Sequence, residues 1–414
     1  MAIQSAIDVN DLSLMMKTSK LASITNGGVL MRLVLVLMFF FSTAVFAQTD
    51  KMVIHSEILN DDINLQIHLP DTYAHSNDFK YPILIVLDGS TQFEHVAANV
   101  GFLSSYAIIP EMITVGVSSD QRMKYFTPTQ INKFKDSSGG AEQFRLFLEQ
   151  ELLSTLGKKY RTSDYQLLTG HSLAGLFSSY VALTPNSQFD AVISISPSLW
   201  WDSDWLVLKS AELLPAKRAK PLRWFLSMAS EPNEMASAFA AQIKQLQDGL
   251  GINSTGNASK QLHWFYKHFP DETHDSTPLV GNIEALKTLF VGWNAVPEIA
   301  VMPLKDLKHF YRQKSAEFGY EFPLFAQQYN VYGLKASYEQ KTAWGVEILA
   351  EGTRVFPNSE VLWDSLATAY DLDGQLEQAI KASDKAVLLA KQTDSVFLNE
   401  ILSQAKHLQS QAKK

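Results

Sequence analysis

No cysteine occurs among the 414 residues of the chain, and this absence removes several kinds of chemistry at once. A thiol nucleophile, a cysteine-based zinc site and any disulfide bond are excluded. Basic residues are scarce as well: 35 lysines and arginines face 43 acidic residues, and the formal net charge is −8. Because no basic run is present, we expect no nucleic-acid partner. With 46% hydrophobic residues, the chain is long enough to bury a large core and to form two domains.

Long hydrophobic runs are also rare, and the conspicuous one lies near the N-terminus. Arg32 precedes the apolar run 33–41, and small residues follow up to Ala47. This run is short for a membrane span, and the order of basic, apolar and small residues is that of a secretory signal peptide. We therefore expect residues 1–47 to be an N-terminal extension and signal peptide, cleaved near Ala47-Gln48. The mature protein would be secreted or periplasmic and would have no stable membrane span.

Two alternatives to this N-terminal prediction stay open. The run could serve as an uncleaved membrane anchor, because the lead-in before it is unusually long for a signal peptide. Translation that starts at Met31 instead of Met1 would explain the same length.

Residues 48–295 show the apolar patterns of an α/β domain. Alternating apolar residues over 52–70 predict an antiparallel pair of strands at a sheet edge. The continuous apolar run 82–87 predicts a strand that is buried on both faces. Further strands are expected at 112–117, 166–169, 191–195, 223–228 and 262–266, and helices at 141–156, 173–183, 233–250 and 277–290. This alternation predicts a mostly parallel sheet covered by helices, with reactive groups at the carboxyl ends of its strands.

Residues 296–414 show a helical pattern throughout, so we expect a second, all-α domain there. Its residues match the spacing of a tetratricopeptide repeat at Trp363, Leu366, Ala367, Tyr370, Gly374, Ala379 and Ala386. One period earlier, Gly333, Gly345 and Pro357 fit a degenerate first repeat. Two such repeats are marginal alone, and we expect this tetratricopeptide-like domain to pack on the first domain. A plain helical bundle is the alternative.

The segment Gly170-His171-Ser172-Leu173-Ala174-Gly175 lies between an expected strand and an expected helix. A serine in this setting is typical of a nucleophile on a sharp strand-to-helix turn, where small neighbours let the backbone approach other elements. Ser172 is therefore the candidate nucleophile.

A serine hydroxyl needs a base and a group that orients the base, and in this sheet type the order along the chain is serine, acid, histidine. His274 is the candidate base, because it follows the last expected strand; His268 is its main competitor. Glu231 is the candidate acid, because it follows the strand before that one. For the acid, Glu234, Asp202 and Asp204 stay open as alternatives. His171 neighbours the nucleophile, and we expect its side chain to point elsewhere.

Ester hydrolysis also requires N–H donors for the oxyanion that forms during the reaction. The backbone N–H after the nucleophile, that of Leu173, is one candidate. The other comes from Gly89 and Ser90, which follow the strand 81–87 and where glycine allows a close approach of the backbone.

With these residues in place, the chain resembles the putative-esterase branch of the α/β-hydrolases, the group that includes ferric-enterobactin esterases and esterase D. The resemblance covers residues 52–293 and rests on Leu87-Asp88-Gly89, Arg122 with Thr127-Pro128, the helix 144–153, Gly170-His171-Ser172, Ser196-Pro197-Ser198-Leu199-Trp200-Trp201 and Glu272-Thr273-His274. It implies an α/β-hydrolase fold and catalytic roles for Ser172 and His274. Secreted members with a C-terminal repeat-like helical region have the same layout.

The chain departs from this family's pattern at two places. Ala174 stands where glycine is usual, which adds a methyl group at a tight contact. The segment 121–128 lacks an acidic residue that is often found between the arginine and Thr-Pro. Arg122 either binds an anionic or catecholate group of the substrate or forms a structural ion pair.

Together these features predict an exported serine esterase that acts on a small-molecule ester and needs no metal and no organic cofactor. Trp200 and Trp201 are candidates for the substrate pocket, with core packing as the alternative. A siderophore-lactone esterase and an acyltransferase are alternative enzymes. An inert hydrolase-fold scaffold that binds a protein partner through its helical repeats is the alternative without enzymatic activity.

Overall fold

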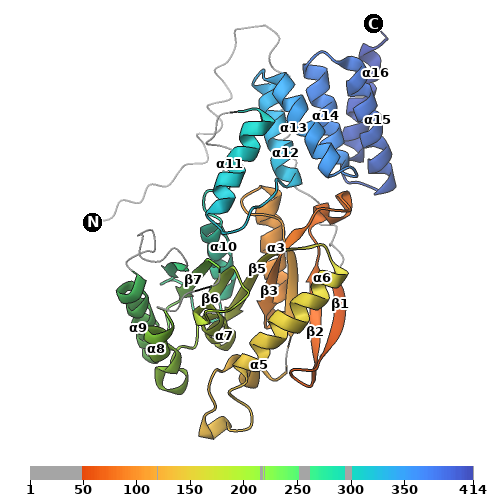
Figure 1. The fold of residues 1–414 in the computed structure, drawn as a ribbon. Helices are drawn as coiled ribbons and strands as arrows, with labels where there is room; N and C mark the ends of the chain where they lie inside the picture. Colours follow the sequence, from red (N-terminus) through yellow and green to blue (C-terminus); the bar gives the residue numbers. More distant parts are fainter. Residues whose placement is uncertain are drawn as a thin grey trace, which may run out of the picture. The chain divides into compact units, whose positions relative to one another are not determined.

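The computed structural model describes residues 49–118, 120–214, 218, 220–250, 262–293 and 301–413 (Figure 1). The expected signal peptide and its cleavage site lie outside these residues. Within the described part of the chain, none of the helices combines the length and apolar character needed to cross a membrane.

Eight strands form one sheet: β1 (Asp50–Ser56), β2 (Asp61–His68), β3 (Tyr81–Leu87), β4 (Ile113–Ser118), β5 (Thr162–His171), β6 (Ala191–Ile195), β7 (Leu222–Met228) and β8 (Leu262–His268). Their order is β1-β2-β4-β3-β5-β6-β7-β8. β2 pairs antiparallel with β1 and β4, and all other neighbours are parallel. The mostly parallel sheet with an antiparallel edge that the sequence predicts is therefore confirmed.

Helices alternate with these strands along the chain: α3 (Gly89–Ser105), α4 (Arg122–Phe126), α5 (Ala141–Leu146), α6 (Leu153–Lys159), α7 (Leu173–Leu183), α8 (Trp201–Leu213), α9 (Asn233–Leu250) and α10 (Thr277–Leu289). A π-helical turn, η3 (Phe147–Leu152), joins α5 to α6. The short 3₁₀ helices η1 (Asp71–His75) and η2 (Asn132–Phe134) also belong to this part of the chain.

Strand β6 shows how helices cover both faces of the sheet. Ser194 lies 2.8 Å from the hydroxyl of Ser178 on α7. The next side chain, Ile195, lies against Gly281 on α10. Because successive side chains of a strand point to opposite faces, α7 and α10 must cover different faces. This double cover explains why β3, with all seven residues buried, reads as a continuous apolar run.

The strand order places a topological switch point beside β3. The chain leaves β3 for β4 on one side and later enters β5 on the other side. The connections after β3 and β5 therefore diverge, and such a point opens a crevice at the carboxyl ends of the strands. Gly89 follows β3 and Ser172 follows β5, so both lie at the carboxyl ends of strands beside this switch point.

In the described residues 301–413 every element is a helix, as the sequence predicts: α11 (Leu304–Ala316), α12 (Ala326–Tyr338), α13 (Thr342–Val355), α14 (Glu360–Leu372), α15 (Leu376–Gln392) and α16 (Leu398–Gln411). Consecutive helices from α12 to α16 pack on one another. Gly374, with φ 77°, makes the turn between α14 and α15, and Ala379 and Ala386 are buried on α15. Their identity as tetratricopeptide repeats stays a prediction, and the expected boundary near residue 296 lies outside the described residues.

Aromatic side chains join these helices to the α/β part of the chain. The ring of Phe79 lies 5.1 Å from that of Phe325 and 4.7 Å from that of Phe356. The backbone N–H of Asn358 donates to the carbonyl of His75 at 3.1 Å. The two regions thus share one hydrophobic core.

Candidate active site

Ser172 stands on a strained turn between β5 and α7. Its backbone has φ 60° and ψ −116°, a conformation that side-chain-bearing residues adopt rarely and mainly where function requires it. Glycine is necessary on both sides of it. A Cβ on Gly170 would lie 2.2 Å from the carbonyl oxygen of Ala174, and a Cβ on Gly175 would lie 2.9 Å from that of Ile195. Close backbone packing therefore explains the small residues of the motif.

Hydrogen bonds to the end of β6 and to the loop after it hold this turn in place. The N–H of Ser172 donates to the carbonyl of Ile195, and the N–H of Ser198 donates to the carbonyl of Ser172, both at 3.0 Å. The hydroxyl of Ser198 lies 3.4 Å from that of Ser172. The sequence alone indicates no role for Ser198, because its place beside Ser172 depends on the pairing of β5 with β6.

The hydroxyl of Ser172, the imidazole of His274 and the carboxylate of Glu231 form a continuous series of contacts. Ser172 Oγ lies 3.0 Å from His274 Nε2. His274 Nδ1 lies 3.0 and 3.1 Å from the two carboxylate oxygens of Glu231. The Glu231 side chain is fully buried, while that of His274 is 29% exposed, so solvent reaches the base but not the acid. An imidazole in this position can take the hydroxyl proton while the carboxylate fixes its ring.

The loops that carry Glu231 and His274 are joined by backbone hydrogen bonds. Glu231 follows β7 and His274 lies between β8 and α10. The N–H of Ser230 donates to the carbonyl of Glu272 at 3.0 Å, and the N–H of Phe269 donates to that of Met228 at 2.8 Å. Parallel pairing of β7 with β8 therefore brings the two side chains to the same edge.

The other candidates lie elsewhere. Among the described residues, no hydrogen bond joins His274 to Glu234, Asp202 or Asp204. Glu234 is exposed, as is His268 at the end of β8. Asp202 and Asp204 belong to a left-handed turn at the start of α8, with φ values of 52° and 63°.

His171 corrects an expectation from the sequence. Instead of pointing away from the site, its ring lies 4.5 Å from the ring of His274. Burial lowers the pKa of His171 to about 3, and the charges of His274 and Arg122 would act in the same direction. A neutral ring therefore packs against the candidate base and does not compete with it for a proton.

The candidate oxyanion donors lie at two helix N-termini. Leu173 is the first residue of α7, and Gly89 and Ser90 are the first two residues of α3. N–H groups in the first turn have no partner within their own helix, and the helix dipole favours negative charge there. A Cβ on Gly89 would lie 2.8 Å from the backbone of Gly116 and Val117, so the start of α3 packs directly on β4.

Of the candidate substrate-binding residues, Arg122 is ion-paired and Trp201 is buried. Arg122 Nε donates to both carboxylate oxygens of Asp88 at 2.9 Å. Trp201 is 2% exposed, and its indole N–H donates to the hydroxyl of Thr129 at 3.0 Å. Trp200 is partly buried against the core, so it retains some surface that a substrate could contact.

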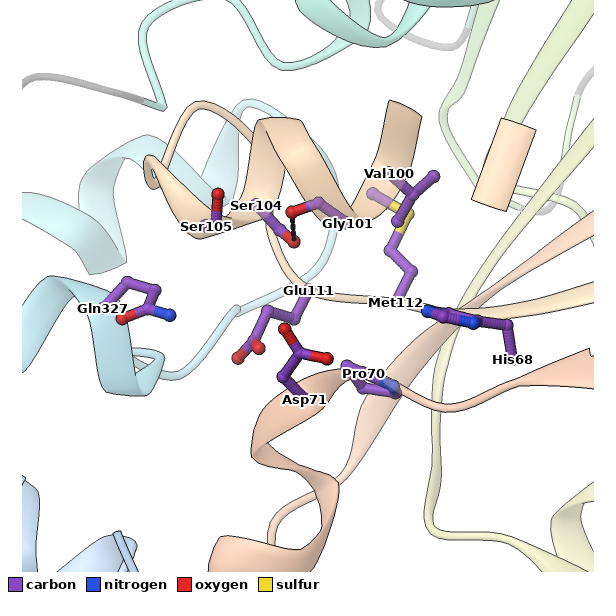
Figure 2. A pocket seen from close by; sticks show the side chains of 10 residues that line it. All are labelled: His68, Pro70, Asp71, Val100, Gly101, Ser104, Ser105, Glu111, Met112 and Gln327. Carbon is purple, nitrogen blue, oxygen red and sulfur yellow. Dashed lines mark hydrogen bonds between the residues drawn. The ribbon is translucent and has the colours of Figure 1, made fainter. Parts of the chain in front are cut away.

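A second polar cluster surrounds a cavity of about 20 Å³ at the other end of α3 (Figure 2). The carboxyl groups of Asp71 and Glu111 lie beside each other in this view, and both residues line the cavity. Gly101 on α3 also lines it, and at 1.5 Å per helical residue it lies roughly 20 Å from Gly89. This volume is enough for about one water molecule, and it is too small for an organic substrate.

Comparison with known proteins identifies the family of the segment that carries Ser172 and Glu231. The family model described as "Putative esterase" matches residues 56–261. The ferri-bacillibactin esterase BesA of Bacillus subtilis is 27% identical over 197 residues, which are 42% of this chain and 68% of that protein.

Solved structures show the same fold. An IroE-like serine hydrolase from Shewanella oneidensis is 25% identical, with a TM-score of 0.65 over 74% of this chain and 99% of that chain. An uncharacterised protein from Capnocytophaga ochracea is 17% identical, with a TM-score of 0.55 over 88% of this chain and all of the other; this likeness concerns the fold alone. The chain therefore belongs to the putative esterase family of α/β-hydrolases and is an ester hydrolase.

Proposed function

We propose that the chain is an exported serine esterase that cleaves carboxylic esters through an acyl-enzyme. The observation that carries this proposal is the unbroken series of contacts from Ser172 through His274 to Glu231. The strained backbone at Ser172 and two helix N-termini beside it supply the rest of the machinery.

Acylation begins when His274 Nε2 accepts the proton of Ser172 and Oγ attacks the ester carbonyl carbon. The carbonyl oxygen becomes an oxyanion, which accepts hydrogen bonds from the N–H of Leu173 and from Gly89 or Ser90. Glu231 stabilises the imidazolium that forms on His274. The ester bond then breaks, and His274 gives its proton to the leaving alcohol.

Deacylation repeats these steps with water as the nucleophile. His274 takes a proton from the water, whose oxygen attacks the acyl-serine carbonyl. The same N–H donors hold the second oxyanion. Its collapse releases the acid and returns the proton to Ser172, so no cofactor takes part.

For the substrate, we propose a siderophore ester. The support is the likeness to the ferri-bacillibactin esterase BesA, whose name states that activity for that protein. Incubation with a cyclic triester siderophore and with its linear ester, followed by mass spectrometry of the products, tests this choice. Free hydroxy acids are expected; transfer of the acyl group to an added alcohol would indicate an acyltransferase instead.

Export and a second domain are further parts of the proposal. The order of Arg32, the run 33–41 and Ala47 supports a signal peptide, and sequencing the N-terminus of exported protein tests for Gln48. We place the catalytic domain at 48–295 and a tetratricopeptide-like domain at 296–414. The spacing of Trp363, Gly374 and Ala379 supports the repeat assignment.

The serine mechanism is tested with p-nitrophenyl acetate and a fluorophosphonate probe. Wild type should hydrolyse the ester and carry the probe on Ser172, and Ser172→Ala should lose the label and at least about 10³-fold in kcat/KM. The matched control is Ser105→Ala at the far end of α3, which should keep both. An unlabelled, inactive wild type, or a Ser172→Ala variant that keeps its turnover, would rule out this mechanism.

A further inference from the structure

Arg122 contacts both chain segments that lead into the candidate oxyanion donors. Its Nε donates to both carboxylate oxygens of Asp88 at 2.9 Å, and its Nη2 donates to the carbonyl of His171 at 3.4 Å. Asp88 directly precedes Gly89, and His171 directly precedes Ser172. One side chain from α4 therefore connects the end of β3 to the end of β5, across the switch point of the sheet.

Both of these segments contain a residue with positive φ. Asp88 has φ 53° and ψ 44°, and Ser172 has φ 60° and ψ −116°. A residue with a side chain costs about 1–2 kcal/mol in such a conformation, which persists only where neighbouring contacts hold it. The bond from Arg122 to the Asp88 carboxylate is a contact of this kind, and it is independent of the backbone bonds that hold Ser172.

The side chain of Asp88 does not take the usual role of an aspartate at a helix start. Such an aspartate normally accepts a hydrogen bond from the first turn of its helix, but Asp88 makes no side-chain cap bond. Its carboxylate turns to Arg122 instead. The first N–H groups of α3, those of Gly89 and Ser90, are thereby left to a substrate oxygen.

The ion pair also argues against Arg122 as an anion-binding group. The carboxylate of Asp88, only 15% exposed, lies on the guanidinium and neutralises its charge. The ring of Phe126 lies 5.8 Å from the same guanidinium. A second anion at Arg122 would therefore meet a neutral pair and the nearby carboxylate of Asp88.

We propose that Arg122 is a positioning residue that fixes the spacing between the two sides of the oxyanion hole, the N–H of Leu173 and those of Gly89 and Ser90. It acts through Asp88 and the carbonyl of His171 and touches no reacting atom. This inference rests on the proposed serine esterase mechanism, and it chooses between the two roles that the sequence left open for this arginine.

The experiment compares a neutral ester with an anionic one. Arg122→Met should lower kcat about 10- to 100-fold, and equally for p-nitrophenyl acetate and mono-p-nitrophenyl succinate, because a misplaced donor weakens the transition state for both. KM should change less than about threefold, since ground-state binding is not involved. Rates are expressed per active site titrated with the fluorophosphonate, so loss of folded protein does not imitate the effect.

Three further variants keep the test decisive if Arg122→Met folds poorly. Asp88→Asn should show the same loss of kcat, and the double variant should lose no more than either single variant, because both remove one connection. Arg122→Lys keeps the charge but cannot bond both partners, and it should remain at least about tenfold below wild type. Lys124→Met on the same helix is the control and should match wild type.

Several outcomes would overturn the inference. A raised KM for the succinate ester alone would make Arg122 a substrate-binding residue. Full kcat in Arg122→Lys, or wild-type kcat in Arg122→Met, would show that the connection is not needed. If wild type itself fails to react with the probe, the proposed mechanism fails; if wild type reacts at Ser172 while the Arg122 variants are unchanged, only the positioning role fails.

Discussion

The two ends of helix α3 differ in how a hydroxyl meets a carboxyl group. At its N-terminal end, the imidazole of His274 stands between the hydroxyl of Ser172 and the carboxylate of Glu231. At its C-terminal end, Thr72 donates directly to Glu111 at 2.7 Å. Since the single proton of Thr72 is used there, Tyr81, 2.9 Å away, donates to Thr72.

Whether a hydroxyl contacts an imidazole or a carboxyl group decides how easily it can lose its proton. A hydroxyl whose proton points to an imidazole can lose it near neutral pH, because histidine is the side chain that exchanges protons in that range. A hydroxyl bonded straight to a buried carboxyl only satisfies that carboxyl. The backbone conformations differ as well. Ser172 has a strained backbone with φ 60°, whereas Thr72 lies in the 3₁₀-helical turn η1.

The sharpest test of this difference is removal of the charge of Glu231, the last group in the series of contacts from Ser172 through His274. Glu231→Gln should lower kcat/KM for p-nitrophenyl acetate about 10³-fold, because the amide no longer stabilises the imidazolium of His274. Glu234→Gln, an exposed neighbour one turn away, is the matched control and should be unchanged. A loss below about threefold in Glu231→Gln would mean that Ser172 and His274 work without an acid.

Glycine-to-alanine substitutions near the two ends of α3 should have different effects. Gly89→Ala should lower kcat about 100-fold and destabilise the fold, because its Cβ would lie 2.8 Å from the backbone of β4 and displace a candidate oxyanion donor. Gly101→Ala meets nothing within 4 Å and should raise the free energy of unfolding by about 0.5–1 kcal/mol. Urea unfolding and ester turnover measure both. Equal behaviour of the two variants would contradict the assignment of Gly89 to the site.

Glu111 should affect stability and leave catalysis unchanged. Burial raises its pKa from 4.5 to about 7, so the folded state binds this proton more tightly than the unfolded state. The resulting stabilisation is complete below pH 4.5 and is lost as the pH rises through about 7, a change of about 3 kcal/mol at 1.4 kcal/mol per pKa unit.

The comparison of wild type with Glu111→Gln isolates this effect. Urea unfolding at pH 5 and pH 8 measures the free energy of unfolding of both proteins. That of wild type should fall relative to that of the variant at pH 8, since glutamine carries no proton to lose. Its kcat should equal that of wild type at both values. A parallel pH dependence of unfolding in the two proteins would mean that Glu111 titrates near its ordinary pKa.

The sequence predicts well those features that depend on neighbours along the chain. The buried run at β3, the small residues around Ser172 and the places of Glu231 and His274 after consecutive strands follow from period, turn chemistry and chain order. Each of these features of the sheet and of the candidate site is specified by a short segment of the sequence.

The features that the sequence did not reveal depend on which strands become neighbours. Ser198 reaches Ser172 because β6 pairs with β5. The ring of His171 meets His274 because the loop after β8 folds back over the end of β5. Arg122 reaches Asp88 across a switch point that only the full strand order defines. Strand order is set by long-range packing, and no local pattern encodes it.

The smallest effect is expected at Ala174, where the family usually has glycine. Ala174 is fully buried, and its methyl group lies 3.1 Å from where a Cβ on Gly170 would stand. Because Gly170 has no Cβ, there is room for the methyl group of Ala174. Ala174→Gly should therefore leave kcat/KM within about threefold of wild type and cost about 1 kcal/mol of unfolding free energy, as glycine does within a helix. Turnover and urea unfolding measure the two quantities. A gain of tenfold or more in kcat/KM would show instead that the methyl group strains the turn at Ser172, and that this departure from the family pattern limits catalysis.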